Sequence, residues 1–142
     1  MNDELLRLES QLCFPLYACA KEVVKQYKPL LDPLGLTYTQ YIAMLVLWEY
    51  GEVNVKTMGE YLYLDSGTLT PVLKRLEQQG YITRKRSDKD ERVLTVKLTK
   101  EGRELKDRAQ IVPEQMACRM SMSKEDFDQL YLLLYKMLGK LQ

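Results

Sequence analysis

Apolar residues recur at helical spacing through the first part of the chain. From Leu5 to Tyr27 they fall mostly three or four positions apart, which predicts a long first helix over residues 3–28. Pro15 lies inside this stretch. Because proline removes an intrahelical donor and crowds the preceding turn, we expect it to bend the helix. Two prolines and a glycine in "KPLLDPLGLT" then end the pattern.

The next two predicted helices have recognisable boundaries. Thr37 is followed three positions later by Gln40, which is the spacing of a capping box, and Gly51 predicts the end of that helix. A shorter helical stretch, "NVKTMGEYL", comes next. These two segments are expected to supply the first two helices of a three-helix core.

The third helix of this core is predicted over the segment "DSGTLTPVLKRLEQQG". Its candidate N-cap is Asp65 or Ser66, and Gly80 is its expected stop. Its buried stripe is expected to consist of Leu69, Val72, Leu73 and Leu76. After the glycine the spacing changes. "YITRKR" and "RVLTVKLT" alternate apolar and polar residues around a polar segment, which predicts a two-stranded hairpin with a charged tip.

Helical spacing resumes at Thr99, is interrupted at Pro113 and restarts near Ser123. A three-helix core followed by a hairpin is the plan of a winged helix-turn-helix. In such modules the later helix enters the major groove of DNA and the hairpin reaches along the backbone. We therefore expect one domain over residues 1–142, mainly α with a small β-hairpin wing, in which residues 37–99 bind DNA.

Composition narrows the classes of function. The chain has a formal net charge of +1 and no histidine, which removes histidine-based catalysis and ordinary zinc sites, so we expect no metal and no cofactor. Its three cysteines lack CxxC spacing. The start of the chain does not resemble a signal peptide, and the longest apolar run, residues 41–48, is too short to span a bilayer. We expect a cytoplasmic protein with no membrane partner.

Positive charge is concentrated in the predicted recognition helix and hairpin. Residues 74–92 hold seven basic and four acidic residues, whereas residues 101–142 hold seven of each. Small residues at the start of the helix would let its N–H groups approach phosphate closely. Together these features predict DNA binding, although the hairpin charges alone fit a solvated loop equally well. The residues concerned are Ser66, Gly67, Thr68, Thr70, Lys74 and Arg75 on the helix and Arg84, Lys85, Arg86, Lys89 and Arg92 on the hairpin. We hypothesise that Asp90 orients Arg92 through a charge-assisted hydrogen bond.

Several of these segments resemble the MarR family of winged-helix regulators, above all "LDSGTLTPVLKR" and "DER…VKLT". "QLCFPLYACAKEVVKQYKPLL" followed by "LTY" resembles its OhrR branch, the repressors that sense organic hydroperoxides. The resemblance implies a homodimer whose subunits pair through residues 1–31 and 100–142. It also implies a pseudo-palindromic double-stranded operator. The family pattern places Ser66, Thr68, Thr70, Pro71, Lys74 and Arg75 on the recognition helix and Asp90 and Arg92 in the wing.

The same resemblance implies a thiol switch. Cys13 matches the peroxide-reactive cysteine of the branch, and Tyr27 and Tyr38 match tyrosines that hydrogen-bond to it from the partner subunit; Tyr17 is a third candidate. Cys118 matches a resolving cysteine, whose disulfide with Cys13 of the other subunit would release the operator. The helix dipole is expected to offer the Cys13 thiolate little, because the residue would lie well inside the first helix.

Other interpretations stay open from the sequence. Free cysteines usually act as small buried hydrophobes, which is the expected role of Cys19. A regulator released by a small apolar or phenolic ligand would leave Cys13 incidental. A thiol-oxidation regulator of a broader stress or virulence regulon would share the mechanism but not the target genes. A thiol peroxidase would need turnover and would give the basic helix no purpose, so we do not expect an enzyme.

Overall fold

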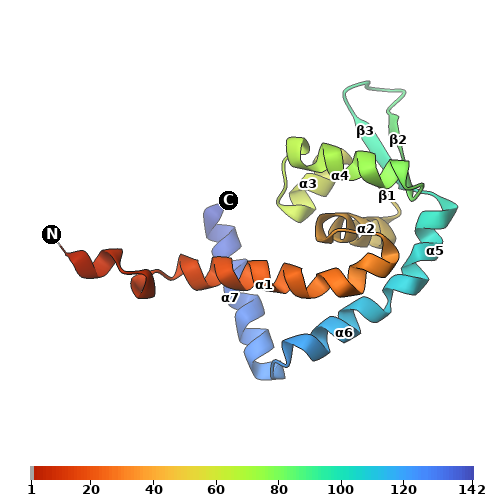
Figure 1. Cartoon of the computed structure of the whole chain (residues 1–142). Helices are drawn as coiled ribbons and strands as arrows, with labels where there is room; N and C mark the ends of the chain where they lie inside the picture. Colours follow the sequence, from red (N-terminus) through yellow and green to blue (C-terminus); the bar gives the residue numbers. More distant parts are fainter. Residues whose placement is uncertain (1) are drawn as a thin grey trace.

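A computed structural model describes residues 2–142 (Figure 1). Residue 1 of the predicted domain lies outside the described residues. The elements, in which η denotes a short 3-10 helix, are η1 Asp3–Leu6, η2 Leu8–Ser10, α1 Cys13–Leu31, η3 Asp32–Leu34, α2 Tyr38–Tyr50, β1 Glu52–Asn54, α3 Val55–Leu62, α4 Ser66–Gln78, β2 Ile82–Arg86, β3 Leu94–Leu98, α5 Lys100–Ala109, α6 Ile111–Met120 and α7 Lys124–Leu141.

Helices α2, α3 and α4 pack around one apolar core. The capping box predicted at the start of α2 is confirmed, because Thr37 and Gln40 exchange side chain–backbone hydrogen bonds of 2.9 and 3.3 Å. Asp65 is the N-cap of α4, and Gly80 follows its end with a φ of +86°. The shared core contains Met44, Leu47, Met58, Leu69, Leu73 and Leu76, whereas Val72 of the predicted stripe is only partly buried. The three-helix core is therefore confirmed.

The sheet contains one strand more than the predicted hairpin. Its order is β1-β3-β2 and both pairings are antiparallel, with Val53 opposite Val96 and Arg84 opposite the same residue on the other side. β1 is only three residues long, so it is too short to produce the alternation by which a strand is recognised. It joins the wing to the end of α2, and the expected winged helix-turn-helix fold is confirmed.

The prediction of one continuous helix over residues 3–28 is wrong. Two short 3-10 turns, Asp3–Leu6 and Leu8–Ser10, lie at the start of that range, and α1 begins only at Cys13. Pro15 is the third residue of α1, where the missing N–H would have no intrahelical partner, so it begins the helix and does not bend it. The leucines that suggested a helix before Cys13 are exposed: Leu5, Leu6, Leu8 and Leu12.

The C-terminal helices also begin at recognisable residues. Thr99 caps α5 and Ser123 caps α7, as their predicted positions require. The interruption expected at Pro113 falls instead at Gln110, which separates α5 from α6, and Pro113 occupies the third position of α6. Pro15 of α1 and Pro113 of α6 therefore mark helix starts, whereas Pro29 lies inside α1, which continues past the predicted end at residue 28 to Leu31.

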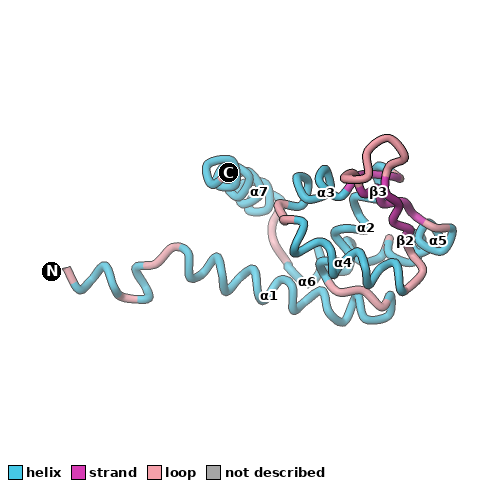
Figure 2. The backbone as a smooth tube through the Cα atoms, turned by 90° about the horizontal axis from the view of Figure 1, so that it is seen from above, coloured by secondary structure: helices cyan, strands magenta, loops and turns pink. Residues whose placement is uncertain are grey.

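The last helix extends away from the core. None of the residues of α7, Lys124–Leu141, is buried, although the helix is rich in leucine and tyrosine. In Figure 1 α7 crosses α1 in projection, but Figure 2 shows the two helices apart. Its exposed apolar side chains include Phe127, Leu130, Tyr131, Leu132, Leu133, Tyr135 and Leu141.

Two kinds of feature are absent from residues 2–142. No single helix in this range has the length and apolar character to cross a membrane, and only the bent pair Cys13–Leu34 and Tyr38–Tyr50 meets that requirement jointly. No three His, Cys, Asp or Glu side chains in the range gather closely enough to hold a metal ion.

Candidate DNA interface and thiol site

Helix α4 has one buried and one exposed face. Leu69, Leu73 and Leu76 are buried at or below 1% exposure and fix the orientation of the helix. The predicted DNA contacts lie on the other side and are all exposed: Ser66, Thr68, Thr70, Pro71, Lys74 and Arg75. The structure therefore brings the small hydroxyl residues and the two basic residues onto one surface.

The N-terminus of α4 differs from the expectation of free amides that would bind phosphate. The carboxylate of Asp65 accepts the backbone N–H of Thr68 at 2.7 Å, and this bond is the main cause of the lowered pKa of Asp65. The Thr70 hydroxyl donates to the Ser66 carbonyl at 2.6 Å. Because the Asp65 carboxylate already accepts the Thr68 N–H, this amide of the first turn is not free to bind a phosphate.

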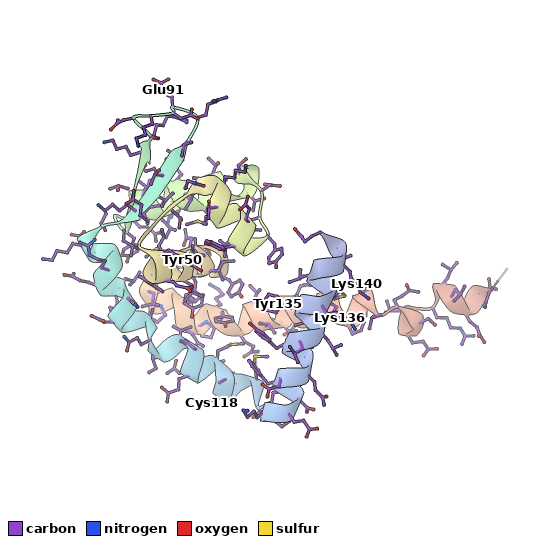
Figure 3. All side chains as sticks on the ribbon, turned by 180° about the vertical axis from the view of Figure 1, so that it is seen from behind. Tyr50, Glu91, Cys118, Tyr135, Lys136 and Lys140 are labelled. Carbon is purple, nitrogen blue, oxygen red and sulfur yellow. The ribbon has the colours of Figure 1, made fainter. Side chains whose placement is uncertain are left out.

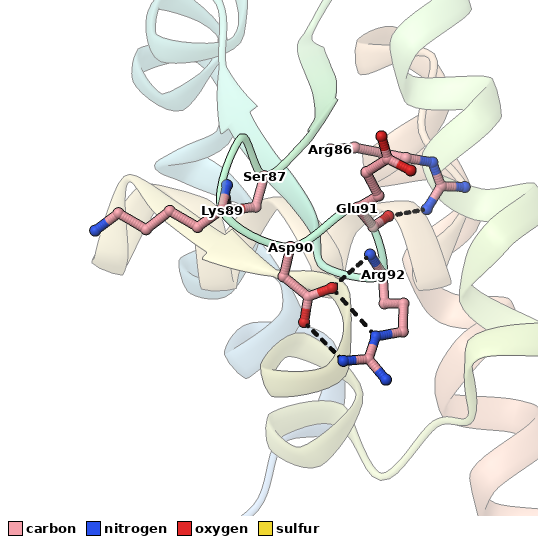
Figure 4. Close-up of polar contacts among 6 residues, drawn as sticks. All are labelled: Arg86, Ser87, Lys89, Asp90, Glu91 and Arg92. Atoms are coloured by element: carbon pink, nitrogen blue, oxygen red, sulfur yellow. Dashed lines mark hydrogen bonds and ion pairs between the residues drawn. The ribbon is translucent and has the colours of Figure 1, made fainter.

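The hypothesis for the wing tip is confirmed in its geometry. Asp90 accepts bonds from the Arg92 backbone N–H at 3.0 Å and from Arg92 Nε at 3.2 Å (Figure 4). These bonds lower the pKa of Asp90, so it is ionised at neutral pH. The Arg92 side chain is nevertheless 92% exposed, so its guanidinium is held in position while it faces solvent.

The other predicted basic residues of the wing fall into two groups. Arg86 donates to the Glu91 carbonyl at 3.0 Å and stays exposed, as does Lys89 at the tip. Arg84 behaves differently, because its guanidinium pairs with Glu77 of α4 at 3.1 Å and its side chain is only 20% exposed. The Arg84 charge therefore does not belong to the free surface charge of the wing, because its ion pair with Glu77 joins β2 to α4.

Glu77 was not among the predicted residues. It accepts both the Arg84 side chain and the Arg84 backbone N–H, at 3.1 Å each, and the side-chain bond is the first cause of its lowered pKa. Seven positions and a turn separate the two residues, so neither the helical nor the strand pattern contains a signal for this pair.

Cys13 lies at the first position of α1 rather than within it. Leu12 precedes it with helical backbone angles and a side chain that cannot cap, so no side chain at the N-cap accepts a hydrogen bond from the amides of the first turn. The expectation that Cys13 lies well inside the first helix is therefore wrong, because the residue lies at the N-terminal end of α1, which is the positive end of the helix dipole. Cys13 is exposed, as is Tyr17 one turn later, whose ring lies 5.3 Å from Lys21 Nζ.

The tyrosines Tyr27 and Tyr38 meet, far from Cys13. Their ring centroids lie 4.8 Å apart, and Tyr41 joins them at 5.7 Å from Tyr27. Burial raises the pKa of all three hydroxyls, that of Tyr41 to about 12. The neighbouring phenol of Tyr38 raises the pKa of Tyr27 further, and those of Tyr27 and Tyr38 do the same for Tyr41. These phenols stay protonated at neutral pH, so their hydroxyls are hydrogen-bond donors.

Cys118 lies on the exposed side of α6, near its end (Figure 3). Its neighbour Arg119 donates to the Gln26 side chain at 3.1 Å, which places this end of α6 beside Gln26 of α1, the residue before Tyr27. Gln26 is thirteen positions after Cys13 on the same helix, which corresponds to about 20 Å. The predicted site residues of one chain thus form two groups: Cys13 and Tyr17 at one end of α1, and Tyr27, Tyr38 and Cys118 toward the other.

Comparison with known proteins agrees with this architecture. Residues 25–109 match the family model described as transcriptional regulator SarA/Rot. The chain is 55% identical over 136 residues to the organic hydroperoxide resistance transcriptional regulator of Bacillus subtilis (strain 168), which covers 96% of this chain and 92% of that protein. The HTH-type transcriptional regulator SarZ of Staphylococcus saprophyticus is 40% identical, over 89% and 86% of the two chains.

Solved structures add a conformational comparison. Reduced AbfR of Staphylococcus epidermidis bound to DNA superposes with a TM-score of 0.82 at 33% identity, over 99% of both chains. The disulfide form of AbfR gives 0.68 at 34% identity, over 96% of both chains. Our structure is thus more similar to the reduced, DNA-bound form. By sequence, family model and fold, the chain belongs to the MarR family of winged-helix transcriptional regulators, which includes the SarA/Rot group and the Bacillus organic hydroperoxide resistance regulator.

Proposed function

We propose that this chain is a dimeric, DNA-binding repressor that senses organic hydroperoxides through Cys13. The observation that carries the proposal is the separation of Cys13 from Tyr27, Tyr38 and Cys118 within one chain. A site that needs all four residues is completed only when Cys13 of one subunit approaches the other three in its partner. The exposed apolar side chains of α7 and of the first half of α1 favour such pairing.

In the reduced dimer, the two α4 helices address successive major grooves of a pseudo-palindromic operator, with half-sites about 34 Å apart. Lys74, Arg75 and the hydroxyl residues of α4 contact DNA, and Arg92 reaches from the wing. We assign residues 37–99 to DNA binding and residues 1–31 and 100–142 to dimerisation. Since a repressor works beside the chromosome, we place the protein in the cytoplasm.

The sensing reaction has two balanced steps. The Cys13 thiolate attacks a peroxide oxygen, the O–O bond breaks, and the alkoxide takes up a proton and leaves as an alcohol while Cys13 becomes a sulfenic acid. The thiolate of the partner's Cys118 then attacks that sulfur, so that an S–S bond forms and the S–O bond breaks, and the departing hydroxide takes up a proton and leaves as water. One hydroperoxide and two thiols give one disulfide, one alcohol and one water. The peroxide is consumed stoichiometrically, without turnover.

In the proposed dimer, the partner's Tyr27 and Tyr38 donate hydrogen bonds from their hydroxyls to the thiolate or sulfenate. The disulfide then joins the start of one α1 to the end of the other α6. Closing this distance moves the helices on which the DNA-binding regions are mounted and destroys the half-site spacing. Related structures of AbfR in reduced, overoxidised and disulfide forms support the proposal that this fold responds to thiol oxidation.

The test compares wild type with single serine variants. A DNA duplex selected from a random library by the reduced protein serves as the operator probe. After equimolar cumene hydroperoxide, we expect wild type to run as a covalent dimer on a non-reducing gel and to release the DNA. Cys13→Ser should do neither. Cys118→Ser should lose the covalent dimer, and Cys19→Ser, which removes another exposed thiol of α1, should behave as wild type. Peroxide-dependent release in Cys13→Ser would refute the sensing mechanism.

A second candidate is a regulator released by a small apolar or phenolic ligand. The observation that favours it is a groove of about 630 Å³ between α2 and the α5–α6 junction, lined by Tyr41, Leu45, Trp48, Lys106 and Pro113 among others. This candidate predicts that an inducing ligand acts on wild type and Cys13→Ser alike and that oxidation has no effect on the operator complex.

A further inference from the structure

The loop between α1 and α2 receives hydrogen bonds from two distant parts of the chain. Gln79 Nε2 donates to the Gly35 carbonyl at 2.6 Å, across 44 positions of sequence. Arg108 Nη2 donates to the Pro33 carbonyl at 2.8 Å, across 75 positions. Two carbonyls of one short loop are thus held from two directions.

The donors come from helices with different roles in the proposed function. Gln79 is the C-cap of α4, the helix that carries the candidate DNA contacts. Arg108 lies in the last turn of α5, and the next helix, α6, contains Cys118 near its end. The loop itself continues α1, which carries Cys13 and Tyr27. The loop therefore lies where the helices of the thiol site meet the end of the recognition helix.

The loop is packed against the apolar core. Leu31, Leu34 and Leu36 are buried at 5% exposure or less. Gly35 has a φ of +69°, a conformation that glycine adopts without steric cost. A Cβ added at that position would lie 3.5 Å from Gln79 Nε2, so the amide is in close contact with the loop.

The C-terminal end of α4 is also held from its other side. The Thr99 hydroxyl donates to the Gly80 carbonyl at 2.7 Å, and the Thr99 backbone N–H donates to the Tyr81 carbonyl at 3.0 Å. Thr99 is the N-cap of α5. α4 is thirteen residues long, about 20 Å, so a tilt of about 10° imposed at its fixed end moves its DNA-facing end by about 3 Å.

We propose that Gln79 and Arg108 are positioning residues that couple the oxidation state of the thiol site to the orientation of the recognition helix through the loop 32–36. This inference rests on the proposed function and adds the route by which disulfide formation reaches α4. Coupling of this kind is a free energy shared between two sites, and it is measured as the ratio of operator dissociation constants in the oxidised and reduced states.

The experiment measures this ratio for the full-length protein and variants with the selected DNA duplex, before and after cumene hydroperoxide. In Gln79→Met, which keeps the length of the side chain without its donor, we expect wild-type disulfide formation on the gel and a coupling ratio at least tenfold lower. Arg108→Met should lower the ratio similarly. Gln78→Met and Asp107→Met, at exposed neighbouring positions, are the matched controls and should keep the wild-type ratio.

The outcomes separate this inference from the proposed function. A wild type that forms no disulfide or keeps the DNA after oxidation refutes the proposed function. A wild type that releases the DNA while both Gln79→Met and Arg108→Met release it equally refutes the coupling route alone. Thermal unfolding by circular dichroism identifies a variant that does not fold, and the decision then rests on the other substitution.

Discussion

The DNA-facing region and the thiol site differ in how much of each a single chain supplies. α4 exposes its candidate contacts on one face, and the wing arginine is held by a carboxylate two residues away. The candidate residues of the thiol site instead fall into two groups that lie toward opposite ends of α1, and α7 buries none of its own residues. Contacts within one chain therefore build the recognition surface, whereas the proposed sensor needs two chains.

The largest effect is expected from breaking the surface that we assign to dimerisation. Leu130 and Leu134 lie one turn apart on α7, so the double change Leu130→Lys and Leu134→Lys puts two charges on one face. We expect a monomer whose operator affinity is roughly 1,000-fold lower, because the two half-sites are no longer bound together. Sedimentation and fluorescence anisotropy measure the two quantities. Lys136→Gln, on the same helix, is the control; a double variant that stays dimeric would contradict the assignment.

The core of the DNA-binding region tests the other side of the comparison. Leu73 is 1% exposed, and Leu73→Ala should lower the free energy of unfolding by about 3 kcal/mol through lost burial and a cavity. Urea denaturation measures this loss, with Glu60→Ala at an exposed position as the control. A loss that disappears in the monomeric α7 variant would show that the stability of this region depends on the partner.

A smaller effect is expected at the wing. Asp90→Asn removes the charge that holds Arg92, so the guanidinium samples more orientations. We expect operator affinity to fall roughly fivefold, with thermal unfolding unchanged because both side chains are on the surface. The same change in the presence of Arg92→Ala should have no further effect on affinity. An additive loss would mean that Asp90 acts independently of Arg92.

The smallest effect concerns the pair that joins α4 to β2. Glu77→Gln should lower stability at neutral pH by about 0.5 kcal/mol, since the carboxylate is 39% exposed and water screens the pair. The lowered pKa of Glu77 means that its stabilisation is complete above about pH 4.5 and is lost as the pH falls through the lowered value. Urea denaturation between pH 3 and pH 7 should therefore show the wild-type and variant curves converge in acid. Parallel curves would contradict a role for the charge.

The core helices could be predicted from the sequence because their boundaries are encoded locally. Thr37 and Gln40 specify the start of α2 within four residues, and Asp65 does the same for α4. The wing could be recognised from the alternation on both sides of its tip. The short strand β1 could not, because its pairing with Val96 is decided by a partner more than forty positions away.

The start of α1 could not be placed because periodicity does not distinguish a helix from an exposed segment that happens to be rich in leucine. Leu5, Leu6 and Leu8 satisfy the pattern but pack against no core within the chain. The same misplacement put Cys13 well inside the predicted helix, whereas it is the first residue of α1. The pairs Glu77–Arg84 and Gln79–Gly35 likewise follow from tertiary structure alone.

The division of the thiol residues along α1 has a genetic consequence. A Cys13→Ser chain keeps Tyr27, Tyr38 and Cys118, and a Cys118→Ser chain keeps Cys13. Each variant alone forms dimers without a complete pair of thiols, but a mixed dimer contains one intact pair and one empty pair. Two alleles that are each blind to peroxide should therefore restore a response when they are expressed in the same cell.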